Sequence, residues 1–260
     1  MKFNFHTHTA RCGHASGNDE EYVLEAISHG FTDLGFSDHV PLLYDCGIEG
    51  TARVPIAQAS DYARSVLALK EKYKDKINIH LGFECEYLPS YFDRTLANVI
   101  SWGAEYIILG QHFYTPEFPA SDSWRHVISK TTDVDSLIQY TNSVINAMKT
   151  GKFSYVAHPD MFNFVGDNSQ YEEQTKRICV LSKELNIPLE LNLLGIRGNR
   201  NYPNEKFWQL AGEIECPVTM GSDAHSPDVV FSQEAIQKAE QIIEKFHLNY
   251  VGMPRLIRLV

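Results

Sequence analysis

Short apolar runs alternate with amphipathic helical patterns along the whole chain. This order favours a parallel sheet, because parallel neighbours need a crossover connection and a helix usually supplies it. About seven or eight such units fit within 260 residues, and no Gly/Ser/Pro-rich linker divides them. We therefore predict one domain, residues 1–260, built as a closed α/β barrel. The predicted strands are Phe3–Phe5, Asp33–Phe36, Ile77–Phe83, Tyr106–Leu109, Tyr155–Ala157, Leu189–Leu191, Val218–Met220 and a weak last one near Tyr250–Gly252.

The helical patterns lie between these runs. The first has the clearest signals: Asn18 is a good N-cap, Glu21 completes a capping box, and Gly30 suits the C-terminal stop. The remaining predicted helices are Ile56–Tyr73, Ser90–Trp102, Val134–Lys149, Tyr171–Leu185, Glu205–Ile214 and Gln233–Phe246.

Chemically active side chains follow nearly every predicted strand. In α/β barrels the functional groups lie at the carboxyl ends of the strands, so these side chains should converge on one rim. Chance would scatter histidines over helices and loops alike. The residues concerned are His6, His8, Asp38, His39, Glu84, Glu86, His112, His158, Asp160, Asn192, Arg197, Asp223 and His225.

Converging imidazoles and carboxylates indicate divalent transition metals, since imidazole suits zinc, iron, nickel and copper, and carboxylate suits manganese. The set is too large for one ion, so we expect two or three metal ions and no organic cofactor. Glu84 is well placed to bridge two of them. Two-metal sites activate a bridging water and neutralise both the attacking and the leaving oxygen in phosphoryl transfer.

Charge and cysteine content narrow the classes of function. A formal net charge of −10 argues against a broad nucleic-acid-binding surface, whereas bound cations still permit a small anionic substrate. No apolar run approaches a membrane span. The five cysteines lack a CxxC pair and indicate free thiols in a reducing compartment, so we expect a cytoplasmic protein. Cys12 lies among the histidines, but its spacing matches no thiolate motif, which favours a bystander over a ligand.

Six ordered segments resemble the polymerase-and-histidinol-phosphatase (PHP) superfamily, and within it the bacterial-type histidinol-phosphatases. The resemblance covers almost the whole chain. One departure is GQHF at Gly110–Phe113, where we expect a serine before the histidine. The segments are HTHT at His6–Thr9, CGHAS at Cys12–Ser16, SDH at Ser37–His39, GFECEY at Gly82–Tyr87, HPD at His158–Asp160 and GSDAH at Gly221–His225.

The resemblance implies a distorted, TIM-like (β/α)7 barrel with a trinuclear centre of zinc, iron or manganese. The implied first metal has four ligands and the other two have three each, with Glu84 shared between the first two. The three implied ligand sets are His6, His8, Glu84 and Asp223; Glu84, His112 and His158; and His14, His39 and His225.

The resemblance also implies hydrolysis of L-histidinol phosphate, a phosphorylated amino alcohol of histidine biosynthesis. We expect Asp223 to accept the proton of the attacking water and pass it on through His225 or a water. Arg197 could form bidentate hydrogen bonds to the phosphate, and Asp160 could pair with the ammonium or imidazole of the substrate. The third metal, through His14 and His39, would hold a phosphate oxygen.

Several alternatives stay open. The chain could act on another small phosphomonoester, on a phosphodiester or nucleic-acid end, or as a metal-binding module without turnover. Glu86 could orient an imidazole or be an exposed strand-end charge, and Asp38 is more consistent with a supporting role than with a ligand. The Pro- and aromatic-rich segment Tyr114–Trp124 could close over the substrate or be an inert loop. The sequence leaves the oligomeric state open.

Overall fold

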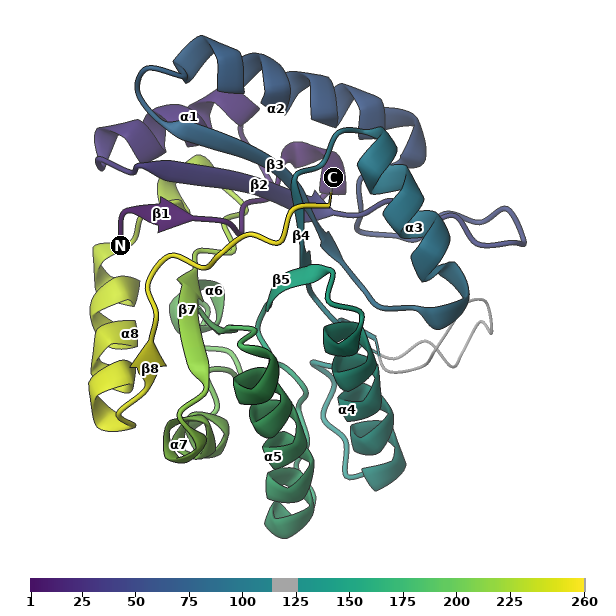
Figure 1. Cartoon of the computed structure of the whole chain (residues 1–260), viewed down its shortest axis with the longest axis vertical. Coiled ribbons are helices and arrows are strands. Elements are labelled where there is room, and N and C mark those ends of the chain that lie inside the picture. Colours follow the sequence, from purple (N-terminus) through teal and green to yellow (C-terminus); the bar gives the residue numbers. More distant parts are fainter. Residues whose placement is uncertain (114–125, 260) are drawn as a thin grey trace.

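A computed structural model describes residues 1–113 and 126–259 of the chain, so the segment Tyr114–Trp124, expected either to close over the substrate or to be an inert loop, lies outside the described residues. Eight parallel strands form one curled sheet in which each strand pairs with the next along the chain, as Figure 1 shows. The distorted parallel α/β barrel is thus confirmed. The strands are β1 (Phe3–Asn4), β2 (Asp33–His39), β3 (Asn78–Cys85), β4 (Tyr106–Leu109), β5 (Phe153–Val156), β6 (Leu189–Asn192), β7 (Pro217–Gly221) and β8 (Asn249–Tyr250).

The helices lie outside the sheet and follow the predicted pattern within a few residues (Figure 1). The first begins directly after Asn18, whose backbone N–H donates to the Glu21 carboxylate at 2.7 Å, as a capping box requires. A one-turn helix after β6 was missed, because five residues are too few to show a helical period. The helices are α1 (Asp19–Ser28), α2 (Ala59–Tyr73), α3 (Pro89–Ser101), α4 (Val134–Lys149), α5 (Asn168–Leu185), α6 (Leu193–Arg197), α7 (Glu205–Ile214) and α8 (Gln233–Lys245).

Strands β2 and β3 run two or three residues past their predicted ends, further than the other strands. Strand β2 continues to His39 and β3 to Cys85, and their register places His39 opposite Glu84. The prediction placed both side chains in loops after the strands. They are instead fixed by the ladder itself, which holds them more rigidly than a loop would.

The barrel closes only at its carboxyl rim. Thr7, beyond β1, makes an isolated parallel bridge to Ala224, beyond β7. The N–H of His8 donates to the Ala224 carbonyl at 2.9 Å, and the N–H of Ala224 donates to the His6 carbonyl at 3.2 Å. Strand β8 pairs with the opposite end of β7, where Pro217 lies beside Asn249. Seven strands therefore surround the rim, and the eighth widens the sheet only at the amino end.

Aromatic side chains fill the barrel interior. The Tyr106 hydroxyl donates to the carbonyls of Phe5 and Phe36, at 2.9 and 3.2 Å. The segment after β8 crosses the amino ends of the strands, seen in yellow in Figure 1, and Leu256 packs against this core. The backbone N–H of Leu259 donates to the Glu105 carbonyl at 3.2 Å. The amino end is therefore covered by the chain's own last residues, and the carboxyl rim is left for a site.

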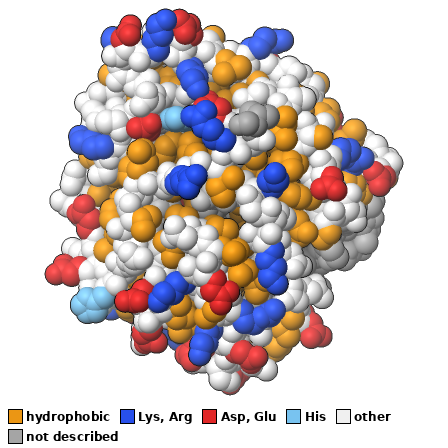
Figure 2. All heavy atoms as spheres, in the orientation of Figure 1, with side chains coloured by type: hydrophobic (Ala, Val, Ile, Leu, Met, Phe, Trp, Pro, Cys, Tyr) orange, Lys and Arg blue, Asp and Glu red, His pale blue; other side chains and the backbone are white. Residues whose placement is uncertain are grey.

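The described surface is mixed in character. In the view of Figure 2, Lys and Arg side chains lie among acidic and apolar ones. Over residues 1–113 and 126–259, none of the helices has the length and apolar character needed to cross a membrane.

Candidate metal centre

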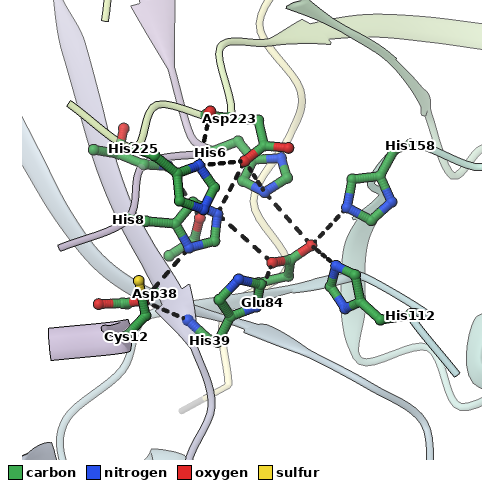
Figure 3. Close-up of polar contacts among 12 residues, drawn as sticks. His6, His8, Cys12, Asp38, His39, Glu84, His112, His158, Asp223 and His225 are labelled. Carbon is green, nitrogen blue, oxygen red and sulfur yellow. Dashed lines mark hydrogen bonds and ion pairs between the residues drawn. The ribbon is translucent and has the colours of Figure 1, made fainter. Parts of the chain in front are cut away.

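Glu84, near the end of β3, is the centre of a cluster of imidazoles (Figure 3). Its Oε1 lies 2.9 Å from His158 Nε2 and 3.6 Å from His112 Nε2, and its Oε2 lies 2.9 Å from His39 Nδ1. The carboxylate is 1% exposed. A Cβ on Gly110 would lie 1.9 Å from Oε1, so this position must be glycine for the carboxylate to fit.

Asp223 forms a second centre beside the first. Its Oδ1 lies 3.2 Å from His8 Nε2, 3.2 Å from His225 Nδ1 and 3.7 Å from His6 Nε2. His6 Nε2 also lies 3.5 Å from the Glu84 carboxylate and so joins the two centres. Asp223 has a φ of 48°, in the left-handed region that a non-glycine residue rarely adopts. Such strain clusters at functional sites, where the surroundings enforce it.

Several buried polar atoms of this cluster lack a hydrogen-bond partner in the described part of the chain. They are His6 Nε2, both ring nitrogens of His8, Glu84 Oε2 and Asp223 Oδ1. An unsatisfied buried polar atom costs about 1–3 kcal/mol, so a concentration of them needs an explanation.

Cations supply that explanation. Donor atoms that could share one ion lie within 4.8 Å of one another in several overlapping groups. Nitrogen and carboxylate oxygen are the ligands that zinc, iron and manganese accept. The residues therefore fit a divalent-metal centre. The groups include His6, His8 and Asp223; His6, Glu84 and His158; and His8, His39 and His225.

The far nitrogens of these imidazoles are held by a second layer of carboxylates. His6 Nδ1 donates to Glu190 at 2.8 Å, and His112 Nδ1 lies 3.2 Å from Glu86. His8 Nδ1 lies 3.4 Å from Asp38. Such partners fix the tautomer and orient the nitrogen that binds metal. Glu86 and Asp38 are both buried, so Glu86 is not an exposed strand-end charge.

Glu190 is a functional residue that the sequence reasoning missed. It is fully buried in β6, and it also accepts from the His158 backbone N–H at 3.1 Å and from Asn192 Nδ2 at 2.8 Å. A Cβ on Gly221 would lie 1.8 Å from its Oε1, so a glycine again makes room for a carboxylate. The available signal was an acid inside the otherwise apolar strand LELN.

The positive charge of nearby histidines keeps the carboxyl groups of Glu84 and Asp223 ionised. Burial favours the neutral carboxyl, but His112, His39 and His6 outweigh it and hold the pKa of Glu84 well below its usual value. In the same way His6 and His225 outweigh burial and lower the pKa of Asp223. Both groups are therefore carboxylates, the form that binds metal.

A cavity of about 640 Å³ opens onto the cluster. Three basic side chains of its described wall were not predicted. The Arg53 guanidinium is buried and donates from Nη2 to Glu86 at 2.7 Å, and Arg200 donates to the Tyr202 hydroxyl at 3.1 Å. The third is His126, whose ring centroid lies 5.8 Å from that of His112. The rest of the described wall is Thr51, Ala52, Glu86, Phe113, Met161 and Leu194, beside His14, His39, Glu84, His112, Asp223 and His225.

Arg197 was predicted to bind the phosphate, but its observed contacts are with the backbone of another loop. It ends α6, and its Nη2 donates to the Ser222 carbonyl at 2.7 Å. It is not among the described residues that line the cavity. The turn of α6, capped by the Asn192 side chain at Gly195 N, directs Arg197 under the loop that carries Asp223.

Asp160 also differs from its predicted role. Its Oδ2 accepts from the Asn204 backbone N–H at 2.6 Å and from Trp208 Nε1 at 2.8 Å. The side chain is buried, lies away from the described cavity wall, and burial raises its pKa to about 6. The HPD turn thus sends His158 to the cluster and anchors Asp160 on α7.

Comparison with known proteins agrees with this geometry. The PHP domain model matches residues 4–193. This chain belongs to the PHP domain family. Histidinol-phosphatase from Bacillus subtilis is 24% identical over 264 residues, covering 90% of this chain and 98% of the relative. The Lactococcus lactis histidinol-phosphatase is 24% identical over 271 residues, covering 95% and 92%.

A solved structure shows the same fold. It is histidinol phosphate phosphatase from Lactococcus lactis, described as complexed with zinc, L-histidinol and phosphate. It superposes with a TM-score of 0.72 at 18% identity, covering 96% of this chain and 95% of that one.

Proposed function

We propose that this PHP domain protein is a metal-dependent phosphomonoesterase that hydrolyses L-histidinol phosphate to L-histidinol and phosphate in histidine biosynthesis. The observation that carries the proposal is the set of unpartnered buried imidazole and carboxylate atoms, among which Glu84 and Asp223 line one cavity. The substrate is taken from the named activity of the Bacillus subtilis and Lactococcus lactis relatives.

Three sets of side chains would hold the metal ions. When bound, the ions supply Lewis-acid activation of water and neutralise the charge that develops on the phosphoryl oxygens. Glu84 would be shared between the first two ions, because its Oε2 lies 3.7 Å from His8 Nε2 of the first set and its Oε1 lies 2.9 Å from His158 Nε2 of the second. The proposed sets are His6, His8, Glu84 and Asp223; Glu84, His112 and His158; and His14, His39 and His225.

Asp223 is the proposed proton acceptor. Its Oδ2 accepts from Asn192 Nδ2 at 3.1 Å, which fixes the carboxylate in one orientation. Its Oδ1 lies 3.2 Å from His225 Nδ1, and His225 is partly exposed in the cavity wall. His225 therefore gives a route by which a proton taken from the attacking water reaches the leaving alkoxide or the solvent.

Substrate contacts follow from the cavity wall. Arg200, three residues after Arg197, lines the cavity, so we assign it the phosphate contact first expected of Arg197. Phe113, Met161 and Leu194 give the wall an apolar part that suits the imidazole ring of histidinol.

Phosphate release from a panel of compounds tests the proposal. The panel holds histidinol phosphate, p-nitrophenyl phosphate, other small phosphomonoesters and a phosphodiester, with metal content measured on the same sample. We expect release that favours histidinol phosphate, that a chelator abolishes, and that Mn²⁺ or Zn²⁺ restores.

The other outcomes separate the alternatives. Equal rates on all monoesters would overturn the substrate assignment and keep the phosphatase. Preference for the diester would favour a nuclease-like activity. Bound metal without any phosphate release would mean a metal-binding module.

A further inference from the structure

The sulfur atom of Cys12 lies beside the imidazoles of His14 and His225. Cys12 ends a short 3-10 helix, Ala10–Cys12, and is only 2% exposed. Its Sγ and one ring nitrogen each of His14 and His225 lie within 4.8 Å of one another. Figure 3 shows Cys12 beside Asp38 at the edge of the cluster.

Local backbone structure fixes Cys12 and His14 relative to each other. Gly13 between them has a φ of 82°, a left-handed conformation that glycine adopts without strain, and across this turn the Cys12 Sγ and a His14 ring nitrogen lie within 4.8 Å. His14 Nδ1 donates to the Cys12 carbonyl at 3.1 Å, which leaves Nε2 with the lone pair. The His14 ring centroid lies 4.8 Å from that of His225 and 5.2 Å from that of His39.

A second observation points to a ligand at the same place. His8 is fully buried, its Nδ1 lies 3.4 Å from Asp38, and its Nε2 has no hydrogen-bond partner in the described part of the chain. His8 shares one group of atoms within 4.8 Å with Cys12 and Asp38, and another with His39 and His225. The sulfur therefore borders the unsatisfied part of the cluster.

We propose that the Cys12 thiolate is a further ligand of the third metal ion, beside His14 and His225, and that it makes this site selective for zinc over manganese. In a tetrahedral zinc site the bond lengths place sulfur and nitrogen ligands about 3.6 Å apart. The Cys12 sulfur and the two ring nitrogens lie within 4.8 Å of one another, so side-chain movements of about 1 Å would bring them to that separation. Thiolate is a soft ligand that favours zinc, whereas manganese prefers oxygen. Binding releases the thiol proton to solvent. The inference rests on the proposed metal centre.

The competing arrangement is a neutral thiol that donates to Asp38. Without an ion, burial and then the Asp38 charge raise the pKa of Cys12 to about 12. A sulfur–metal signal at neutral pH therefore requires that the ion itself displaces the proton, as a bound cation does to a coordinating thiol.

Cobalt(II) substitution distinguishes the two arrangements. The full chain is stripped, loaded anaerobically with Co²⁺ and compared with Cys12→Ser and with Cys46→Ser, which removes an exposed cysteine as the matched control. We expect a near-ultraviolet sulfur-to-cobalt charge-transfer band in the native protein and in Cys46→Ser, and its loss in Cys12→Ser while the visible cobalt bands remain. Visible bands without the charge-transfer band in the native protein, or a band that persists in Cys12→Ser, would overturn the inference.

Zinc measurements give a second readout. Chelator competition should show that Cys12→Ser lowers the affinity for one zinc ion by more than the roughly 10–100-fold typical of losing a residue that only supports a ligand. The affinity for Mn²⁺ should change little. Zinc-edge X-ray absorption of the native protein should contain a sulfur shell at about 2.3 Å. If Cys12→Ser does not fold, the native cobalt spectrum decides alone. A native protein that binds no cobalt would overturn the metal centre itself, and the inference with it.

Discussion

Among the described residues, histidine and carboxylate side chains meet at both ends of this barrel, and only one of these two groups has the properties of a metal centre. At the amino end, His80 Nε2 lies 3.0 Å from Asp33 and His80 Nδ1 lies 3.6 Å from Glu105. Lys70 completes this group, 2.6 Å from Glu105. At the carboxyl rim, by contrast, Glu84 faces several imidazoles without a lysine or arginine partner among the described contacts.

The difference lies in how completely the polar atoms are satisfied. Both His80 nitrogens face carboxylates, Lys70 balances the acid charge, and a cavity of about 280 Å³ there is covered by the C-terminal segment. At the rim the buried atoms of His6 and His8 lack hydrogen-bond partners. Residue type alone therefore does not indicate a metal site. Buried and unsatisfied donor atoms do.

The largest expected effect comes from Glu84→Gln compared with Glu105→Gln. Removing the Glu84 charge takes away the ligand shared by two proposed ions, so kcat should fall by about 10³-fold or more. Glu105→Gln, at the other end, should leave kcat within about twofold, since surface-side changes rarely alter a distant site. Steady-state kinetics with metal content measured in parallel test this pair. An equal loss of kcat in both variants would contradict the assignment of the active site to the carboxyl rim.

A smaller effect is expected at Glu190, which touches no proposed ion. Glu190→Gln keeps the shape but weakens the hold on His6 Nδ1, so metal affinity should fall by about 10–100-fold. Chelator competition measures the change. Unaltered metal affinity, together with an unaltered melting temperature, would show that Glu190 does not help to hold the metal ligands in place.

Metal removal should destabilise the native chain. Ions that bind only the folded state add about 2.7 kcal/mol for each site at a free concentration of 100 Kd. We expect calorimetry to show a clearly lower melting temperature after chelation, and the same drop in Glu105→Gln. Glu84→Gln should lose most of this dependence. A chelator-insensitive native protein would contradict the metal centre.

The smallest effect concerns acid stability at the amino end. Burial alone would raise the pKa of Glu105, but His80 and Lys70 outweigh it and lower the value from 4.5 to about 2. Because the folded-state value is depressed, the stabilisation is complete above pH 4.5 and is lost as pH falls towards 2.

Glu105→Gln should therefore flatten the dependence of unfolding free energy on pH within this window. Lys70 is 41% exposed, so solvent screens the pair and the change should be about 1 kcal/mol or less. Urea unfolding of metal-free protein between pH 2 and 5 measures it. An unchanged slope would mean that Glu105 does not contribute.

The set of residues that reach the carboxyl rim was predictable, because it depends on where each strand ends along the chain. A parallel strand delivers the residue at its end to the carboxyl rim wherever its partner lies, so His6, Glu84 and Asp223 could be assigned to one place from spacing. The same reasoning did not give the contacts that Arg197 and Asp160 make in the structure. Arg197 ends the one-turn helix α6 and Asp160 lies in the turn after β5, and in such short segments the direction of a side chain depends on a few backbone torsions that no periodic pattern records.

By itself, the sequence determined the alternation of strands and helices and the rim to which its histidines belong, since both follow from hydrophobic periodicity. Only the tertiary structure decided which polar atoms are satisfied. Arg200 rather than Arg197 lines the cavity, and Glu190 lies behind His6. Cys12, set aside on spacing alone, lies beside His14 and His225. Such contacts join residues far apart along the chain, and their energies depend on burial and distance, which exist only after folding.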